Sequence, residues 1–203
     1  MSKVKRVTVY SASTENVPPK FKQHAYRLGQ LMAENGWVQC NGGGDVGLMG
    51  ASSRGALDAG GVVDCVILKI FVNGPNPLPF RTVKVATTMA DRKAGLRENA
   101  DAFVALPGGL GTLDELAEVL CARQLSFHQR PIVLVNTDGY FDALLQFIRE
   151  GIRQNFVSEH ILTAMGVADA PEQAIEFIKN YRPFKIDKTR LESTEMNAAS
   201  ANE

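Results

Sequence analysis

The chain has 203 residues and a mass of 22.1 kDa, which suits one α/β domain with a sizeable core, or one domain with a tail. Lysine and arginine together number 22, as do aspartate and glutamate, so no overall charge attracts the protein to nucleic acid or to an anionic membrane. Three cysteines without a C-x-x-C spacing indicate neither a disulfide framework nor a zinc site. We therefore expect neither nucleic acid nor a membrane as a partner.

The N-terminus passes directly into a strand-like pattern, without the basic region, apolar core and cleavage site of a signal peptide. No apolar run reaches the roughly 18 residues that a membrane-spanning helix needs. These features predict a reduced, cytoplasmic setting.

The first predicted strand covers residues 4–10, which alternate and are rich in valine. A turn with Ser13 at its centre follows the carboxyl end of this strand. Its hydroxyls can hold a phosphate or form only turn hydrogen bonds, and the second alternative is favoured. Pro18 and Pro19 then mark the start of a helix, which Gly36 ends.

A glycine-rich turn follows the second predicted strand, residues 37–40. Its residues 42–47 match G-x-G-x-x-G, the dinucleotide fingerprint. However, the turn follows the second strand, and the next strand, 62–70, ends without the acidic residue that would bind a ribose. We interpret the turn as a close approach of the backbone to a phosphate or sugar, with Gly43 and Gly44 as candidates, and not as an NAD site.

Proline and glycine exclude a helix or a central strand from residues 71–80, which we expect to form a loop on the surface or over a site. A strand over 82–87 follows, and a helix begins near Met89. Arg92 and Lys93 then place two cations in the first turn of that helix, where they oppose its dipole unless an anion is near. Arg92 is the better site candidate, whereas Lys93 can equally be solvated.

The most informative stretch is Leu106-Pro-Gly-Gly-Leu-Gly-Thr-Leu-Asp-Glu115, after an apolar strand at residues 102–105. The pattern indicates strand, glycine turn and helix, a geometry that points backbone N–H groups at a ligand such as phosphate. Thr112 can add a hydroxyl, and Glu115 a carboxylate one turn later. Thr112 and Glu115 also have the spacing of a capping box, and this stretch alone favours neither alternative.

The rest of the chain adds a strand at 132–136, a helix at 140–152 and short helical pieces at 156–165 and 171–180. We expect a domain over residues 1–182 and a polar, mobile tail over 183–203. The fold class is α/β, a single-domain Rossmann-like open parallel sheet with helices on both faces. Ligands of such sheets bind at the carboxyl ends of the strands, where all of these motifs fall.

The sequence also resembles a known family. Residues 107–115 match the PGGxGTxxE motif of the Lonely Guy (LOG) family, the cytokinin-activating phosphoribohydrolases formerly labelled lysine decarboxylases. Further landmarks occur in the same order: the triple glycine at 42–44 with GLMG at 47–50, Met89 with Arg92 and Lys93, and N-x-DGYF at 136–141. The resemblance covers roughly residues 4–178.

The resemblance implies cleavage of the N-glycosidic bond of a nucleoside 5′-monophosphate, which releases a free base and ribose 5-phosphate. It implies that Arg92 and Glu115 are catalytic, that Gly109, Gly111 and Thr112 bind phosphate and ribose, and that Lys93 lies beside the substrate. The other positions that we assign to substrate contact are Ser13, Gly43, Gly44, Met89, Gly108, Leu110 and Cys121. It also implies a homodimer.

The chemistry of the residues agrees with this activity. A carboxylate such as Glu115 can stabilise a positively charged ribose or position the attacking water, and Arg92 offers a planar fork of donors. We expect no cofactor and no metal, since the three histidines have no ligand spacing. No lysine stands out as one that would carry pyridoxal phosphate, so a lysine decarboxylase is not expected.

The chain departs from the family pattern at Asn41, Ala90 and Cys121, and it lacks an acidic residue between Cys65 and Ala90. These positions belong to the rim around the base and ribose, so the preferred base is not predicted. AMP or N6-modified adenine nucleotides are the leading substrates. The alternatives are a general nucleotide nucleosidase in salvage and a non-catalytic carrier of a nucleotide or a molybdenum cofactor on the same fold.

Overall fold

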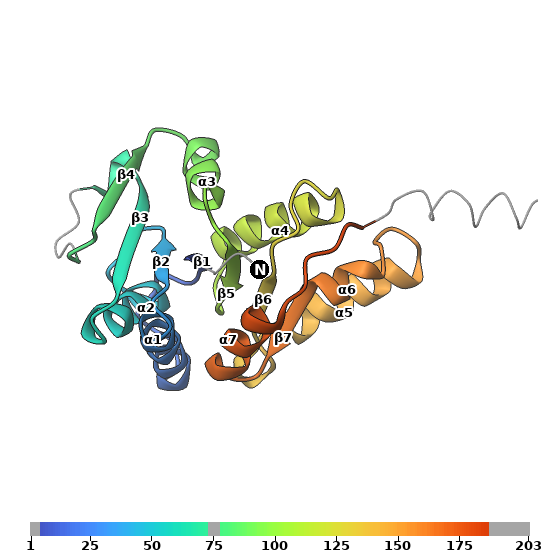
Figure 1. Ribbon diagram of the computed structural model, residues 1–203, viewed down its shortest axis with the longest axis horizontal. Coiled ribbons are helices and arrows are strands. Elements are labelled where there is room, and N and C mark those ends of the chain that lie inside the picture. The colour runs from blue at the N-terminus through green and yellow to red at the C-terminus, as the bar shows by residue number, and fades with distance from the viewer. Residues whose placement is uncertain (1–4, 73–77, 187–203) are drawn as a thin grey trace, which may run out of the picture.

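In the computed structural model, which describes residues 5–72 and 78–186, seven strands form one sheet in which every pairing is parallel. The sheet has the order β4-β3-β2-β1-β5-β6-β7 (Figure 1). The strands are β1 Arg6–Tyr10, β2 Val38–Asn41, β3 Val62–Leu68, β4 Thr82–Ala86, β5 Ala102–Ala105, β6 Ile132–Val135 and β7 Met165–Ala168. This confirms the predicted open parallel sheet.

Helices cover both faces of the sheet, as predicted. Apolar residues of α1, α2 and α7 pack in one core layer, and those of α3, α4, α5 and α6 pack in the other. The helices are α1 Pro19–Glu34, α2 Gly47–Asp58, α3 Met89–Arg97, α4 Leu110–Gln124, α5 Asp142–Arg153, α6 His160–Ala164 and α7 Pro171–Asn180, with short 3-10 helices η1 Lys69–Phe71 and η2 Thr137–Gly139. Within the described residues, no helix is long and apolar enough to cross a membrane.

The strand order reverses beside β1. The chain moves outward from β1 through β2 and β3 to β4, and then returns to pair β5 with the other edge of β1. Ligands of doubly wound sheets bind where the strand order reverses in this way, at the carboxyl ends of the strands. The loops after β1, β2 and β5 are therefore the ones expected to surround a ligand.

Two expected elements differ from the structure. Residues 165–168 form the edge strand β7, although we predicted no strand there and placed Met165 in a helical piece. The segment is short and contains Gly166, which weakens its strand pattern; a Cβ on Gly166 would lie 2.8 Å from the Phe177 ring, so glycine lets α7 pack closely. In addition, β3 ends at Leu68, and no α-helix is described between β3 and β4. Part of the loop predicted at 71–80 lies outside the described residues.

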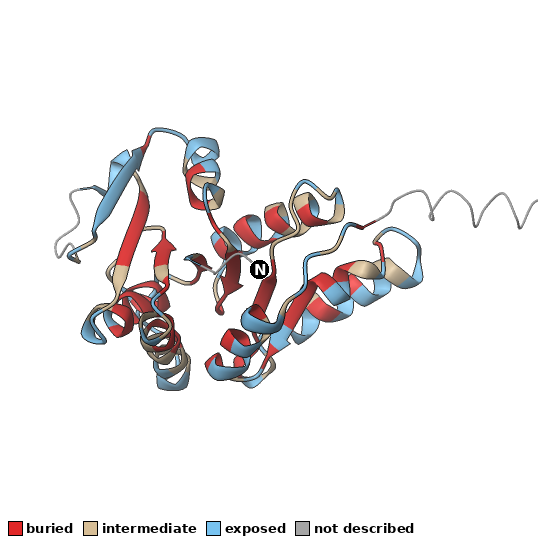
Figure 2. Ribbon diagram, in the orientation of Figure 1, coloured by how far each residue is buried: buried red, intermediate tan, exposed pale blue. Residues whose placement is uncertain are grey.

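Burial follows the sheet order (Figure 2). The central strands β1, β5 and β6 are almost entirely buried, whereas four of the five residues of the edge strand β4 are exposed. Packing extends to the last described residues, because Ile186 is buried and Phe184 lies over the buried Arg123 guanidinium. The start of the segment predicted as a tail therefore contacts the domain, and residues 187–203 lie outside the described part.

Candidate active site

The glycine turn after β5 leads directly into α4, which begins at Leu110 with Gly109 as its N-cap. Thr112 is the third residue of the helix and is buried, so the alternative of a capping box from Thr112 to Glu115 is wrong. A Cβ on Gly108 would lie 2.1 Å from Thr112 Oγ1, so Gly108 is needed for packing. Gly109 and Gly111 differ from it, since a Cβ on either would enter open space.

Arg92 of α3 and Glu115 of α4 form an ion pair in which Arg92 Nη1 donates to Glu115 Oε1 at 2.7 Å. The glutamate is buried, and the arginine side chain is largely so. Burial raises the pKa of Glu115 above its usual value, and the charge and hydrogen bond of Arg92 oppose that rise. The pair is thus a buried carboxylate held in place by a guanidinium whose remaining donors are not used by Glu115.

The glycine turn after β2 lies against the same arginine. A Cβ on Gly42 would lie 1.9 Å from Arg92 Nη2, so only glycine at this position leaves room for the guanidinium. Gly43 has a φ of +81°, and Gly44 N–H donates to Met49 Sδ at 3.1 Å. A Cβ on Gly44 would lie 3.6 Å from the Ser13 Cβ, which places the first turn beside the second.

The loop after β1 is joined to the glycine turn after β5. Ala12 N–H donates to the Pro107 carbonyl at 3.1 Å. From the other side, Tyr140 Oη donates to the Gly108 carbonyl at 2.6 Å. Three loops at the carboxyl edge of the sheet therefore meet, and two hydrogen bonds hold the turn that presents Gly109 and Gly111.

Ion pairs also connect α3 to α4 beside the site. Lys93 Nζ lies 2.9 Å from Asp114 Oδ1 and 3.9 Å from Glu118 Oε2, and Arg97 Nη2 lies 3.3 Å from Glu118 Oε1. The hydrogen bond to Asp114 raises the pKa of Lys93. Lys93 thus faces the acidic side of α4 at the margin of the site.

The remaining predicted residues are exposed, and within the described part of the chain none forms a hydrogen bond to either member of the ion pair. Met89 and Leu110 are exposed at the first positions of α3 and α4, and Ser13 is exposed in the first turn. Cys121 is exposed nearly two turns after Glu115 and about 240° around α4 from it, so within one chain it faces away from the pair.

Several residues of this arrangement were not among the sequence candidates. Gly42 was noted only as part of a dinucleotide pattern and of a family landmark, and Tyr140 only as part of another landmark. Asp114 and Glu118 are four residues apart on one helix, and Lys93 and Arg97 are four residues apart on another. Two acidic and two basic residues at the same spacing could have indicated that the two helices can pair. Nothing in the sequence, however, said that the two helices are neighbours.

Comparison with known proteins agrees with the sequence motifs. The family model described as "Possible lysine decarboxylase" matches residues 49–178. A probable cytokinin riboside 5′-monophosphate phosphoribohydrolase of Oryza sativa subsp. japonica is 38% identical over 98% of this chain and 82% of its own length. The chain belongs to the LOG family. A cytokinin riboside 5′-monophosphate phosphoribohydrolase of Arabidopsis thaliana is 36% identical over 90% of this LOG-family chain and 84% of its own length.

Solved structures share the fold of this LOG-family chain. The molybdenum cofactor binding protein of Rippkaea orientalis is 29% identical, with a TM-score of 0.65 over 88% of this chain and 98% of its own. The molybdenum cofactor carrier protein of Chlamydomonas reinhardtii is 22% identical, with a TM-score of 0.66 over 87% of this chain and 96% of its own. At that lower identity the likeness concerns the fold alone.

Proposed function

We propose that this LOG-family chain is a phosphoribohydrolase that cleaves the N-glycosidic bond of a nucleoside 5′-monophosphate. One water is consumed, and a free base and ribose 5-phosphate are formed. AMP and N6-modified adenine nucleotides, including cytokinin nucleotides, are the substrates that we place first. Membership of the LOG family supports the class of reaction. The observation that carries the proposal is the buried Arg92–Glu115 pair beside a glycine turn with open space at Gly109 and Gly111.

The turn after β5 and the start of α4 form the phosphate and ribose subsite in this proposal. Helix N-termini bind anions through free N–H groups and the positive end of the helix dipole. Gly109 and Gly111 leave that position uncovered, and the buried Thr112 supports the turn from below through its contact with Gly108. The 5′-phosphate then fixes the ribose at the carboxyl edge of the sheet.

Glu115 acts on the ribose in this mechanism. As the bond to the base breaks, the electron pair leaves with the base and positive charge develops on the ribose ring. The Glu115 carboxylate stabilises that charge and takes a proton from the water that attacks C1′. The departing base takes up one proton, and Glu115 returns to the carboxylate when it releases its own. Arg92 holds the carboxylate in position and opposes the rise in its pKa that burial causes, and its other donors are available to the ribose or phosphate oxygens.

A non-catalytic carrier is the second candidate, because the Rippkaea orientalis protein with the same fold is a molybdenum cofactor binding protein. A carrier has no evident use for a buried carboxylate paired with arginine, so we place it second. We do not propose lysine decarboxylation, since the lysine beside the site, Lys93, is paired with Asp114. A homodimer and a cytoplasmic setting remain our proposals.

The test is base release from AMP, GMP, CMP, UMP and isopentenyladenosine monophosphate, followed by chromatography. We expect adenine-type bases to be released and Glu115→Gln to lower kcat at least about 100-fold, the usual contribution of a general base. Glu176→Gln is the matched control, because Glu176 is exposed on α7.

The two candidate functions give different results in this test. A Glu115→Gln variant that hydrolyses nucleotides at the wild-type rate would exclude the proposed mechanism. Binding of a nucleotide without release of any base would place the carrier first. Equal rates with purine and pyrimidine nucleotides would favour the general nucleosidase.

A further inference from the structure

A cavity lies at the opposite edge of the sheet from the Arg92–Glu115 pair. It has a volume of about 650 Å³, and its charged lining residues are Lys5, Arg6, Arg81, Asp101 and Arg130. All five lie at or just before the amino ends of β1, β4, β5 and β6. The volume falls within the usual range of small-molecule sites, about 300 to 1,000 Å³.

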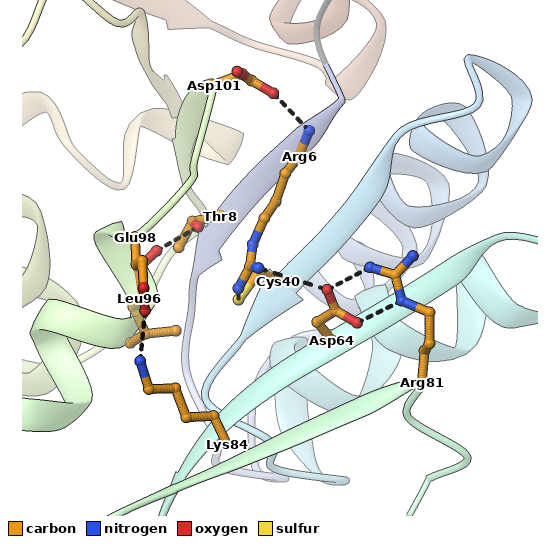
Figure 3. Close-up of polar contacts among 9 residues, drawn as sticks. All are labelled: Arg6, Thr8, Cys40, Asp64, Arg81, Lys84, Leu96, Glu98 and Asp101. Carbon is orange, nitrogen blue, oxygen red and sulfur yellow. Dashed lines mark hydrogen bonds and ion pairs between the residues drawn. The ribbon is translucent and has the colours of Figure 1, made fainter.

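The carboxylates at this edge are already occupied (Figure 3). Asp64, which is buried, accepts two hydrogen bonds from Arg81, at 2.9 and 2.7 Å, and lies 3.6 Å from Arg6 Nη1. Asp101 Oδ2 accepts the backbone N–H groups of Lys5 and Arg6, at 2.8 and 2.9 Å. Four cationic side chains and two carboxylates thus meet at this edge, and one of these carboxylates, Asp101, accepts hydrogen bonds from backbone N–H groups.

Donors of the arginines remain unused. Arg6 Nε is buried and has no partner among the described residues, and Arg6 Nη2 donates only to Cys40 Sγ, a weak acceptor. Arg130 Nη1 donates to the carbonyls of Arg97 and Ala100 at the end of α3. Within residues 5–72 and 78–186, no carboxylate forms an ion pair with Arg130 or Lys5.

Arg130 is held by hydrogen bonds and an aromatic contact, although no carboxylate in the described part of the chain forms an ion pair with it. Its guanidinium carbon lies 5.3 Å from the centre of the Phe103 ring, and burial lowers its pKa. The hydrogen bonds from Arg130 Nη1 to carbonyls at the end of α3 cap that helix. Helix capping does not explain the excess of positive charge around the cavity. A bound anion would relieve that excess and supply acceptors for the unused donors.

We propose that this cavity binds the phosphoryl group of a small phosphorylated molecule, or free phosphate. Guanidinium forks match phosphate oxygens in geometry and charge, and a dianion equals the excess of four cations over two carboxylates. The site is separate from the nucleotide site proposed above, because it lies at the amino ends of the strands. The proposal therefore stands or falls independently of the hydrolase activity.

Isothermal titration calorimetry of the full chain with inorganic phosphate and with ribose 5-phosphate tests this site. The titrations use an Arg92→Gln background, which weakens anion binding at the carboxyl edge. We expect Lys5→Gln with Arg130→Gln to raise Kd at least tenfold. The matched control, Lys179→Gln with Arg149→Gln, removes two exposed charges on α7 and α5 and should leave Kd unchanged.

A variant of Lys5 alone keeps the test valid if the Arg130 change impairs folding. Lys5 is exposed, and its ammonium group has no ion pair among the described residues, so Lys5→Gln should fold normally and raise Kd several-fold. An unchanged Kd in both variants, or an equal loss in the control, would overturn the proposal. Equal affinities for inorganic phosphate and ribose 5-phosphate would show that the phosphoryl group alone is recognised. Tighter binding of ribose 5-phosphate would identify a sugar phosphate as the ligand.

Discussion

Glycine occurs at Gly109 and Gly111 although neither backbone angle nor crowding requires it there. Neither residue has a positive φ, and a Cβ on either would meet nothing within 4 Å. Glycine costs helix stability relative to alanine, so Gly111 within α4 is locally unfavourable for folding. A ligand that approaches the backbone is a physical reason for glycine at such a position.

Gly111→Ala should therefore change stability and substrate binding in opposite directions. We expect the free energy of unfolding to rise by up to about 1 kcal/mol, because alanine is the better helix residue. The KM for AMP should rise about tenfold, since a methyl group would occupy the proposed phosphate subsite. Thermal unfolding and steady-state kinetics measure the two effects. A more stable variant with an unchanged KM would show that the phosphate does not approach Gly111.

Sequence patterns predicted the site residues unevenly. Arg92 became a candidate because two cations in the first turn of a helix oppose its dipole, and Glu115 because it lies one turn after a glycine turn at a strand end. The family resemblance implied that both are catalytic. The role of Gly42 could not be predicted, since it depends on a guanidinium 50 residues later in the chain that packs against its Cα. The alternatives for Thr112 and Glu115 also needed the structure, because the first residue of α4 decides whether a capping box can form.

The turn between β6 and α5 acts on the site through a single side chain. Asn136 Oδ1 accepts the Phe141 N–H at 2.7 Å, and Asp138 and Gly139 within the turn both have positive φ. This geometry directs Tyr140 to the Gly108 carbonyl. The turn thus positions the glycine loop although it belongs to a different strand.

Tyr140→Phe tests this positioning. The variant keeps the aromatic contacts with Phe21 and Phe141 but loses the hydrogen bond to Gly108, with a cost of about 1 kcal/mol. We expect KM for nucleotides to rise about fivefold with little change in kcat. Tyr26→Phe is the control, since it removes a similar bond, to Asp58 at 2.8 Å, between α1 and α2. Equal kinetics in the two variants would contradict a positioning role.

Helices and strands with a clear hydrophobic pattern were located correctly from the sequence, whereas a short strand without such a pattern was not. The helices α1 and α3 and the central strands lie where their patterns indicated. The edge strand β7 was missed because four residues with a glycine carry little pattern, and its pairing with β6 comes from tertiary contacts. The contact between α3 and α4, which brings Arg92 to Glu115, is likewise a property of the assembled sheet.

The neutral form of one histidine, His128, contributes to the stability of the domain. His128 packs against Phe103, its Nε2 bonds to the Val119 carbonyl at 3.1 Å, and Nδ1 accepts the Arg130 N–H at 3.2 Å. Burial lowers the pKa of His128 from 6.5 to about 4. The unfolded chain therefore binds a proton at a higher pH than the folded protein does.

This difference predicts a direction for stability with pH. The contribution of His128 is fully present above pH 6.5 and is lost as pH falls from 6.5 toward about 4. Between pH 7 and pH 5, denaturant unfolding should show a larger loss for wild type than for His128→Gln, by roughly 1 kcal/mol or less because His128 is partly exposed. His160→Gln on α6 is the control. Parallel pH profiles for wild type and His128→Gln would contradict the role of His128.

The fold class could be predicted because the order of strands, glycine turns and helices leaves few alternatives for a chain of this length. The order of the strands within the sheet could not be predicted, because nothing in the first half of the sequence indicates that β5 pairs with the free edge of β1. That pairing creates the reversal of strand order beside β1. The cavity around Arg130 was not predicted for the same reason, because its cations come from strands that are far apart in the chain.

The central position of β1 has a consequence for protein synthesis. The ribosome releases β1 to β4 before β5, so a nascent chain of about a hundred residues carries a half-sheet in which one edge of β1 has no partner. Unpaired edges of this kind invite pairing with other chains. The same nascent chain contains Arg92 but lacks Glu115. A stalled or truncated product would therefore be prone to aggregation and would lack the Arg92–Glu115 pair, and translation must reach the second half before the domain is protected.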